Sequence, residues 1–168
     1  MRNGEAVQSC TKSKARTILL VEDSPGDVRL TREALRESSA QVVLEVARDG
    51  VEAMEMLRGE NTREGCFPDL ILLDLNLPRK DGREVLAEIK ADPHLRLIPV
   101  VVLTTSTADS DIQHAYELHA NCYVSKPADV DEYFLMIRRC EEFWFKTATL
   151  PKLEPLSRRS AHGPGACA

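Results

Sequence analysis

Three short runs of consecutive apolar residues constrain the fold of this chain more than any other feature. They are residues 18–21 (ILLV), 70–73 (LILL) and 100–103 (VVVL). A strand with one solvent-facing side alternates apolar and polar residues, whereas a parallel strand buried on both faces is apolar at successive positions. The runs therefore predict a parallel sheet with both faces covered.

Segments with helical spacing alternate with the strands, which gives five strand-helix units. The expected strands are residues 17–21, 42–47, 69–75, 98–105 and 121–125, and the expected helices are residues 27–38, 50–58, 81–91, 110–120 and 129–146. Right-handed crossovers between parallel strands convert this order into a doubly wound α/β sandwich. Ligands of such sandwiches bind beyond the carboxyl ends of the strands, so we expect the functional residues there.

Composition argues against several classes of function. The net charge of −5 provides no basic field for sequence-independent nucleic-acid binding. No apolar run approaches membrane-spanning length, and the first residues lack the apolar core of a signal peptide. The five cysteines are scattered without a C-x-x-C pair or a metal-ligand pattern, which indicates free thiols. We expect a cytoplasmic protein that binds neither nucleic acid nor membrane.

The chain is expected to form one domain with a tail at each end. Residues 1–15 are polar without periodicity, and the C-terminal segment is rich in Pro, Gly, Ser and Ala. Segments of this kind bury too little apolar surface to offset the entropy of ordering them. We predict a disordered tail at residues 1–15, a domain at residues 16–147 and a flexible tail at residues 148–168.

Polar side chains stand at the carboxyl ends of four of the five expected strands. Glu22 and Asp23 stand at the end of the first, Asp74 of the third, Thr104 and Thr105 of the fourth and Lys126 of the fifth. Taken singly, each fits an ordinary turn or strand position. Taken together, they would meet on one rim of the sheet. Carboxylate oxygens gathered there would suit Mg²⁺ together with a phosphate.

The segments around these positions resemble the receiver domain of two-component response regulators. The resemblance covers roughly residues 17–146 and is carried by VED (21–23), DLNLPRKDG (74–82), VVLTTS (101–106) and YVSKP (123–127), in the family's order. It implies a flavodoxin-like fold with strand order 2-1-3-4-5. It also implies a signalling protein that accepts a phosphoryl group from a histidine kinase and is not an enzyme in the ordinary sense.

The resemblance assigns roles to the residues at the rim. Asp74 matches the phosphoacceptor, whose carboxylate attacks a phosphohistidine to form an aspartyl phosphate. Asp23 matches a Mg²⁺ ligand, Glu22 its acidic neighbour that reaches the metal through water, and Asn76 a ligand through its backbone carbonyl. Lys126 matches the lysine that contacts a phosphoryl oxygen. Cations are needed because a carboxylate nucleophile and an anionic phosphoryl group repel each other.

Three further positions acquire roles from the resemblance. Thr104 matches the switch hydroxyl that turns toward the phosphoryl group, and Tyr123 matches the aromatic switch that follows it. Tyr123 also fits a plain core aromatic of a strand. The Lys126–Pro127 peptide is expected to be cis, which costs little before proline. Thr105 stands where the family commonly has a small residue, so phosphorylation is expected to be slower here.

The last helix is expected to provide the output surface. Its apolar side chains include Tyr133, Ile137, Phe143 and Trp144, which we predict to form a dimer or partner face. A plain docking helix is the alternative. The loop before the third strand, CYVSKP without a following Phe, and the terminal FW resemble the single-domain regulators paired with phytochrome kinases. A bacteriophytochrome histidine kinase and a homodimer are the partners implied.

Other functions remain open at this point. An aspartate-nucleophile phosphatase also uses a strand-end Asp and Mg²⁺, but it needs a second Asp where this chain has Asn76. A P-loop hydrolase fails because no G-x-x-x-x-G-K-[ST] follows the first strand. A receiver-like adaptor that works without phosphorylation is a third reading, which an intact Asp74 and Lys126 disfavour.

Overall fold

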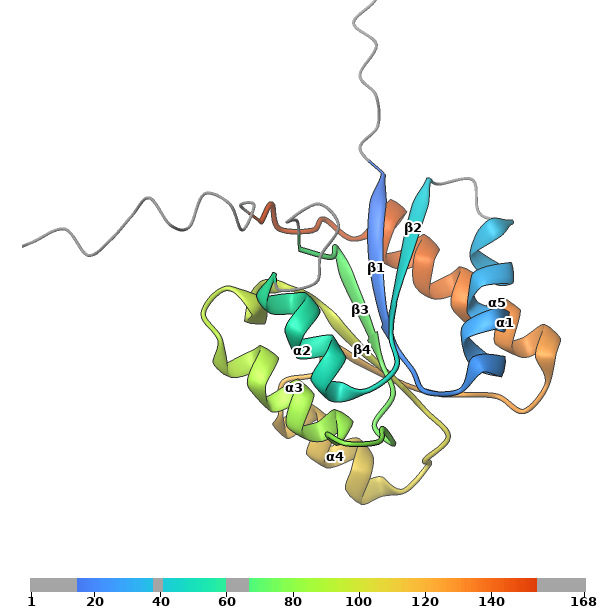
Figure 1. The fold of residues 1–168 in the computed structure, drawn as a ribbon. Coiled ribbons are helices and arrows are strands. Elements are labelled where there is room, and N and C mark those ends of the chain that lie inside the picture. The colour runs from blue at the N-terminus through green and yellow to red at the C-terminus, as the bar shows by residue number, and fades with distance from the viewer. Residues whose placement is uncertain (1–14, 38–40, 60–66, 154–168) are drawn as a thin grey trace, which may run out of the picture.

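The structure is a computed structural model, and it describes residues 15–37, 41–59 and 67–153 (Figure 1). Five parallel strands form one sheet in the order β2-β1-β3-β4-β5, which confirms the predicted order. The strands are β1 (Arg16–Val21), β2 (Val42–Ala47), β3 (Leu70–Leu73), β4 (Val100–Thr104) and β5 (Cys122–Ser125). The helices are α1 (Pro25–Arg36), α2 (Gly50–Arg58), α3 (Gly82–Ala91), α4 (Asp109–Glu117) and α5 (Val130–Glu142), with a 3₁₀ turn η1 (Leu95–Leu97) and a π-helical turn η2 (Phe143–Thr147).

Helices cover both faces of the sheet. Figure 1 shows α1 and α5 together on one face and α2, α3 and α4 on the other. Successive residues of β1 enter different cores: Leu19 and Val21 pack toward the α2–α4 face, while Ile18 and Leu20 pack toward α1 and α5. This double burial explains why the strands are apolar at every position.

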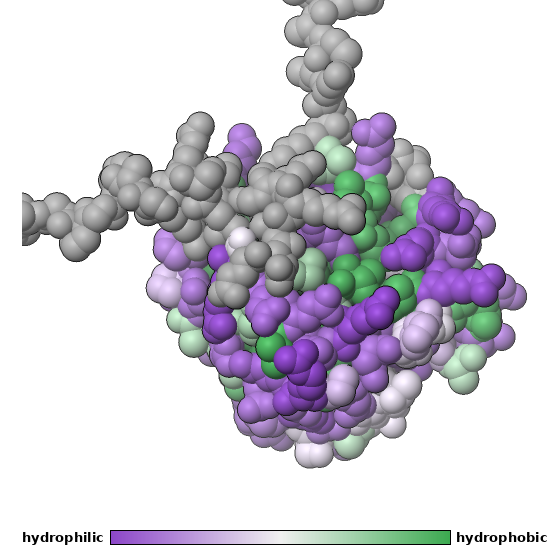
Figure 2. Space-filling model, in the orientation of Figure 1, coloured by the Kyte–Doolittle hydropathy of each residue, from purple (hydrophilic) through white to green (hydrophobic). Residues whose placement is uncertain are grey.

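The two edges of the sheet are less covered than its centre. In β2, Val43 is exposed and most of its neighbours are half-buried. Figure 2 shows a hydrophobic strip over this edge on an otherwise mostly hydrophilic face. The opposite edge strand, β5, is also only partly buried.

Side-chain caps fix where most of the helices begin. Asp81 forms a capping box with Glu84 at the start of α3. Ser24, Asp49 and Asp129 cap α1, α2 and α5 in a similar way. Each cap satisfies backbone N–H groups that have no partner within the helix. These caps hold the first turns of four helices at the carboxyl edge of the sheet.

Gly82 lets α3 begin directly against the third strand's end. A Cβ at this position would lie 2.1 Å from the carbonyl oxygen of Asp74 and 2.7 Å from Cα of Leu75. The amide of Gly82 donates to the carbonyl of Leu75 at 2.9 Å. The start of α3 and the backbone of Asp74 are therefore one packed unit.

The described residues include only part of the two predicted tails. The sheet begins at Arg16, and residues 1–14 lie outside the described residues. Leu153 is partly buried against the core on the α2–α4 face, so residues 148–153 of the predicted tail run along the domain. Residues 154–168 lie outside the described part. Within the described part no helix is long and apolar enough to cross a membrane.

Two of the five cysteines can be placed. Cys122 in β5 and Cys140 in α5 are free thiols, as predicted, and both are half-buried. Burial raises the pKa of both, that of Cys140 to about 11. The thiols at positions 10, 66 and 167 lie outside the described residues.

Candidate functional site

The carboxyl ends of the strands bring the predicted rim residues together. The amide of Asp74 donates to the carbonyl of Val21 at 3.0 Å, which ties the end of β3 to the end of β1. The amide of Lys126 donates to the carbonyl of Thr104 at 2.8 Å, which ties the end of β5 to the end of β4. Glu22, Asp74 and Thr104 are all buried.

Lys126 is the centre of this cluster. Its side chain is 4% exposed, and its ammonium contacts Asp74 at 2.6 Å, Asp27 at 2.9 Å and also Glu22. Asp27 was not predicted as a site residue, although the sequence places it directly after VEDSPG, at the start of an expected helix. The sequence gives an ordinary reason for an acid in the first turn of a helix, and only the packing of α1 shows that it reaches Lys126.

The charges at the cluster do not balance. Three carboxylates, those of Glu22, Asp27 and Asp74, face one ammonium, so the formal sum is 1 − 3 = −2 when all are ionised. Burial raises the pKa of Glu22 despite its hydrogen bond from Lys126. Burial alone would lower the pKa of Lys126, but its hydrogen bonds to Asp74 and Glu22 outweigh this and raise it. The ammonium stays charged, and an excess of negative charge remains.

The predicted metal ligands come from the ends of β1 and β3, which lie side by side, but they are not assembled into a cage. Asp23 is exposed, whereas Glu22 and Asp74 are buried and paired with Lys126. Among the described residues, no three Asp, Glu, His or Cys side chains are grouped to hold a metal ion. The chemistry of the donors nevertheless fits a hard divalent cation, because carboxylates and a backbone carbonyl are the ligands that such ions take. The excess negative charge favours the same kind of ion.

Asn76 links the acceptor to the predicted switch. Its backbone amide donates to Asp74 Oδ1 at 3.0 Å, and its Nδ2 donates to Thr104 Oγ1 at 3.4 Å. The amide of Ser106 also donates to Thr104 Oγ1, at 3.3 Å. Thr104 is fully buried, so its hydroxyl is held between the acceptor loop and the turn after β4.

Tyr123 meets the same turn from β5. Its hydroxyl donates to the carbonyl of Ser106 at 3.0 Å, and its ring packs against the core on the α2–α4 face. Both predicted switch residues, Thr104 and Tyr123, therefore bind Ser106, which was not predicted. Ser106 is the last residue of VVLTTS, but the sequence does not show that its backbone is shared.

The Lys126–Pro127 peptide is trans, as are all peptide bonds of the described residues, so the predicted cis bond is wrong for this structure. Trans is the lower-energy isomer of an X–Pro bond by roughly 0.5–1 kcal/mol. Lys126 reaches its carboxylates with the trans bond in place.

The predicted partner face on α5 is also corrected in part. Tyr133 is 3% and Ile137 1% exposed, because these residues, one helical turn apart, face the sheet. The hydroxyl of Tyr133 lies 3.0 Å from that of Thr31, which joins α5 to α1. Phe143 is 52% exposed and Trp144 is half-buried, so of the four predicted residues these two are open to a partner.

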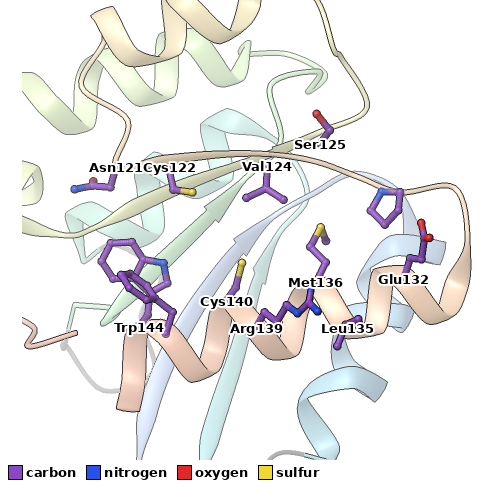
Figure 3. Close-up of a pocket in the computed structure, with 12 residues that line it drawn as sticks. Asn121, Cys122, Val124, Ser125, Glu132, Leu135, Met136, Arg139, Cys140 and Trp144 are labelled. Carbon is purple, nitrogen blue, oxygen red and sulfur yellow. The ribbon is translucent and has the colours of Figure 1, made fainter. Parts of the chain in front are cut away.

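A pocket of about 740 Å³ lies beside this end, between β5 and α5. Cys122 and Val124 line it from β5, Met136 and Cys140 line it from α5, and Trp144 lines it from η2. Figure 3 shows Val124 pointing toward α5, and Met136 and Cys140 pointing toward β5. The pocket is a largely apolar surface beside an edge strand.

The chain is similar to a known protein family and to several known proteins. Residues 18–138 match the response regulator receiver domain. Response regulator Rcp1 of Synechocystis sp. is 52% identical over 137 residues, which are 81% of this chain and 93% of that protein. A solved structure of the Mn²⁺-bound form of Rcp1 is 50% identical and has a TM-score of 0.75, covering 82% of this chain and 99% of that one.

Two other solved structures are similar. The phosphorylated cyanobacterial phytochrome response regulator RcpA is 54% identical with a TM-score of 0.79, covering 82% of this chain and 99% of that one. The bacteriophytochrome response regulator AtBRR is 43% identical with a TM-score of 0.62, covering 83% and 99%. The family match spans most of the described sheet and its helices. The chain belongs to the response regulator receiver family of two-component signalling.

Proposed function

We propose that Asp74 accepts a phosphoryl group from a phosphohistidine of a histidine kinase. The observation that carries the proposal is the pairing of a buried Asp74 carboxylate with the Lys126 ammonium at 2.6 Å. One carboxylate oxygen forms the new bond to phosphorus while the P–N bond to the imidazole breaks, and the imidazole leaves with that bond's electron pair. The acyl phosphate product stays on this chain until water cleaves it.

The residues around Asp74 have distinct tasks in this step. Lys126 is positioned to contact the incoming phosphoryl oxygens and to offset their charge, since its ammonium already faces the acceptor. The backbone amide of Asn76 orients Asp74 through Oδ1. Thr104 is held on the other side of Asn76, from where its hydroxyl can turn to donate to a phosphoryl oxygen.

A divalent cation is part of the proposal, and Mg²⁺ is the ion we assign. Asp23, Asp74 and the backbone carbonyl of Asn76 would hold it, with Glu22 beside them through water. When bound, the ion supplies positive charge that offsets the repulsion between Asp74 and the phosphoryl group. The formal excess of negative charge around Lys126 supports this assignment, as does the Mn²⁺-bound form of the relative Rcp1.

The partner we infer is a phytochrome-type histidine kinase, and a bacteriophytochrome in particular. The names of the relatives RcpA and AtBRR support this inference. We also infer a homodimer through the end of α5, where Phe143 is exposed beside the apolar pocket that Trp144 lines. Localisation in the cytoplasm follows from the same inferred partner.

The protein is proposed to act as a phosphoacceptor and not as a phosphatase. A phosphatase of the aspartate-nucleophile class needs a general acid two residues after the nucleophile. Asn76 occupies that place, and its amide is bonded to Thr104. An amide cannot supply a proton to a leaving group at neutral pH, so turnover of external phosphoesters is not expected.

The test is intact mass spectrometry after incubation with Mg²⁺ and a small acyl phosphate. Wild type should gain one phosphoryl group per chain, and neither Asp74→Asn nor a chelator-treated sample should gain it. Sizing of the same samples tests the homodimer. A wild type that takes no adduct from the acyl phosphate or from a phytochrome kinase would leave the phosphorylation-independent adaptor as the better function.

A further inference from the structure

The start of α4 is held differently from the starts of the other long helices. Its N-cap, Ala108, makes no side-chain cap, whereas α1, α2, α3 and α5 each begin at a Ser or Asp that does. The first turn of α4 is held instead by its own Asp111, which contacts two residues from outside the helix. A helix start without a cap is easier to displace, so these contacts decide its position.

Asp111 is bonded through both carboxylate oxygens. Arg83 Nη2 of α3 donates to Oδ1 at 2.7 Å, and the Ser106 hydroxyl donates to Oδ2 at 2.6 Å. The Ser106 hydroxyl and the Arg83 guanidinium both lower the pKa of Asp111. The side chains of Arg83 and Asp111 are 24% and 27% exposed, so the ion pair is partly shielded from water.

Arg83 is itself held in place at the start of α3. It is the second residue of α3, and its Nη1 also donates to the N-cap Asp81 at 3.2 Å. The residue before it, Gly82, lies against the Asp74 backbone. Arg83 therefore connects the helix start that supports the acceptor to the turn that carries the switch.

Ser106 is where this connection reaches the switch residues. Its amide donates to the Thr104 hydroxyl and its carbonyl accepts from the Tyr123 hydroxyl. Moving Ser106 would change both contacts together. We propose that Arg83 is a positioning residue of the switch: through Asp111 and Ser106 it holds the turn between β4 and α4 in the position where Ser106 binds both Thr104 and Tyr123.

The proposal rests on the proposed function in one respect, namely that this arrangement of Ser106, Thr104 and Tyr123 is the one favoured when Asp74 carries a phosphoryl group. Linkage then requires that any contact that stabilises this arrangement also strengthens the binding of a phosphoryl mimic at Asp74. Removing the Arg83–Asp111 pair must therefore weaken the binding of that mimic, although neither residue contacts the acceptor.

The experiment uses beryllofluoride with Mg²⁺ as the mimic and the full chain labelled with 3-fluorotyrosine. Three tyrosines give three ¹⁹F resonances, and Tyr123→Phe assigns the one of interest. The variants are Arg83→Gln, Asp111→Asn and their combination. The matched control is Arg58→Gln. Arg58 also donates a hydrogen bond to α3, to the Glu88 carboxylate at 3.0 Å, but Glu88 lies far along that helix from Arg83.

Each single variant should lower the affinity for beryllofluoride roughly fivefold and should shift the Tyr123 resonance of the unliganded protein. The double variant should be no weaker than the singles, because both remove the same pair. Arg58→Gln should behave as wild type, and Arg83→Lys should recover part of the affinity. A general loss of structure would move all three resonances, whereas the proposal requires Tyr123 to move most.

Two failures are distinguishable. A wild type that binds no beryllofluoride overturns the proposed function. The Tyr123 resonance of unliganded Arg83→Gln still decides whether Arg83 positions the turn that holds Tyr123. An unchanged Tyr123 resonance in both Arg83→Gln and Asp111→Asn overturns the positioning role, whatever the affinity for the mimic.

Discussion

Lys126 lies across β4 from Asp74, and its ammonium still reaches that carboxylate at 2.6 Å. The side chain passes over the end of β4 and also meets Glu22 and Asp27, which come from the opposite side of the cluster. One buried cation thus joins the ends of β1, β3 and β5 with the first turn of α1. Its charge supports the fold and the proposed chemistry together.

Lys126→Met should therefore damage both. Removing one partner of a buried charge cluster typically costs about 3–5 kcal/mol of unfolding free energy. Urea denaturation measures this cost, and intact mass after acyl phosphate treatment should show little or no adduct. Lys146→Met, at an exposed position after α5, is the control and should leave both measurements unchanged. A loss of stability below about 1 kcal/mol would show that Lys126 does not neutralise the cluster.

Glu22→Gln is expected to stabilise the metal-free protein near neutral pH. Burial raises the pKa of Glu22 above 4.5, so folding favours its protonated form. That contribution is fully present below the unfolded pKa and is lost as pH rises through the folded pKa. Gln is neutral at every pH, so the stability of the variant relative to wild type should increase as pH rises from the acid side.

Thermal unfolding across this pH range, in chelator, measures the difference. Glu142→Gln, exposed on α5, should show no comparable trend. Added Mg²⁺ should narrow the gap near neutral pH, because a cation near Glu22 favours its ionised form. A variant that is less stable than wild type throughout would show that the Glu22 bond to Lys126 outweighs the burial of its charge.

Gly82→Ala should destabilise the protein and slow phosphorylation. The new methyl would lie 2.1 Å from the Asp74 carbonyl oxygen, and only a backbone shift can relieve that contact. Overpacking of this kind typically costs about 1–3 kcal/mol. Gly26→Ala in α1 is the matched control, since its methyl would meet only Ser24 Oγ at 3.6 Å. Equal stability of the two variants in urea would show that α3 can move freely from Asp74.

The sheet and the helix starts could be read from local patterns. Apolar runs such as residues 70–73 mark doubly buried strands, and the helical spacing expected over residues 81–91 agrees with α3. The gathering of Glu22, Asp74 and Lys126 also follows from their positions at strand ends, because parallel strands share one carboxyl edge. These features depend on neighbouring residues and on topology alone.

The features that were missed depend on how separate elements pack. Asp27 joins Lys126 only because α1 crosses the sheet where it does, and Arg83 meets Asp111 only because α3 and α4 are neighbours. Helical periodicity marked an apolar stripe on α5 but not which part of it faces the sheet. Tyr133 was therefore placed on a partner face, although it is buried in the core.

The buried phenol of Tyr133 leads to a prediction at alkaline pH. Burial raises its pKa from 10.0 to about 12, so folding favours the neutral ring. The corresponding stability is complete below the unfolded pKa and is lost as pH rises through the folded one, by up to about 2–3 kcal/mol. Tyr133→Phe removes this loss, but it also removes the hydrogen bond to Thr31, which typically contributes about 1 kcal/mol.

The variant should accordingly be less stable than wild type near neutral pH and should overtake it between the two pKa values. Urea denaturation at a series of pH values measures the difference between the two proteins, so that groups titrating in both cancel. Tyr116→Phe is the control, because Tyr116 is 50% exposed and its removal deletes no buried phenol. A constant difference between Tyr133→Phe and wild type across the alkaline range would show that the ring ionises in the folded protein as readily as in the unfolded chain.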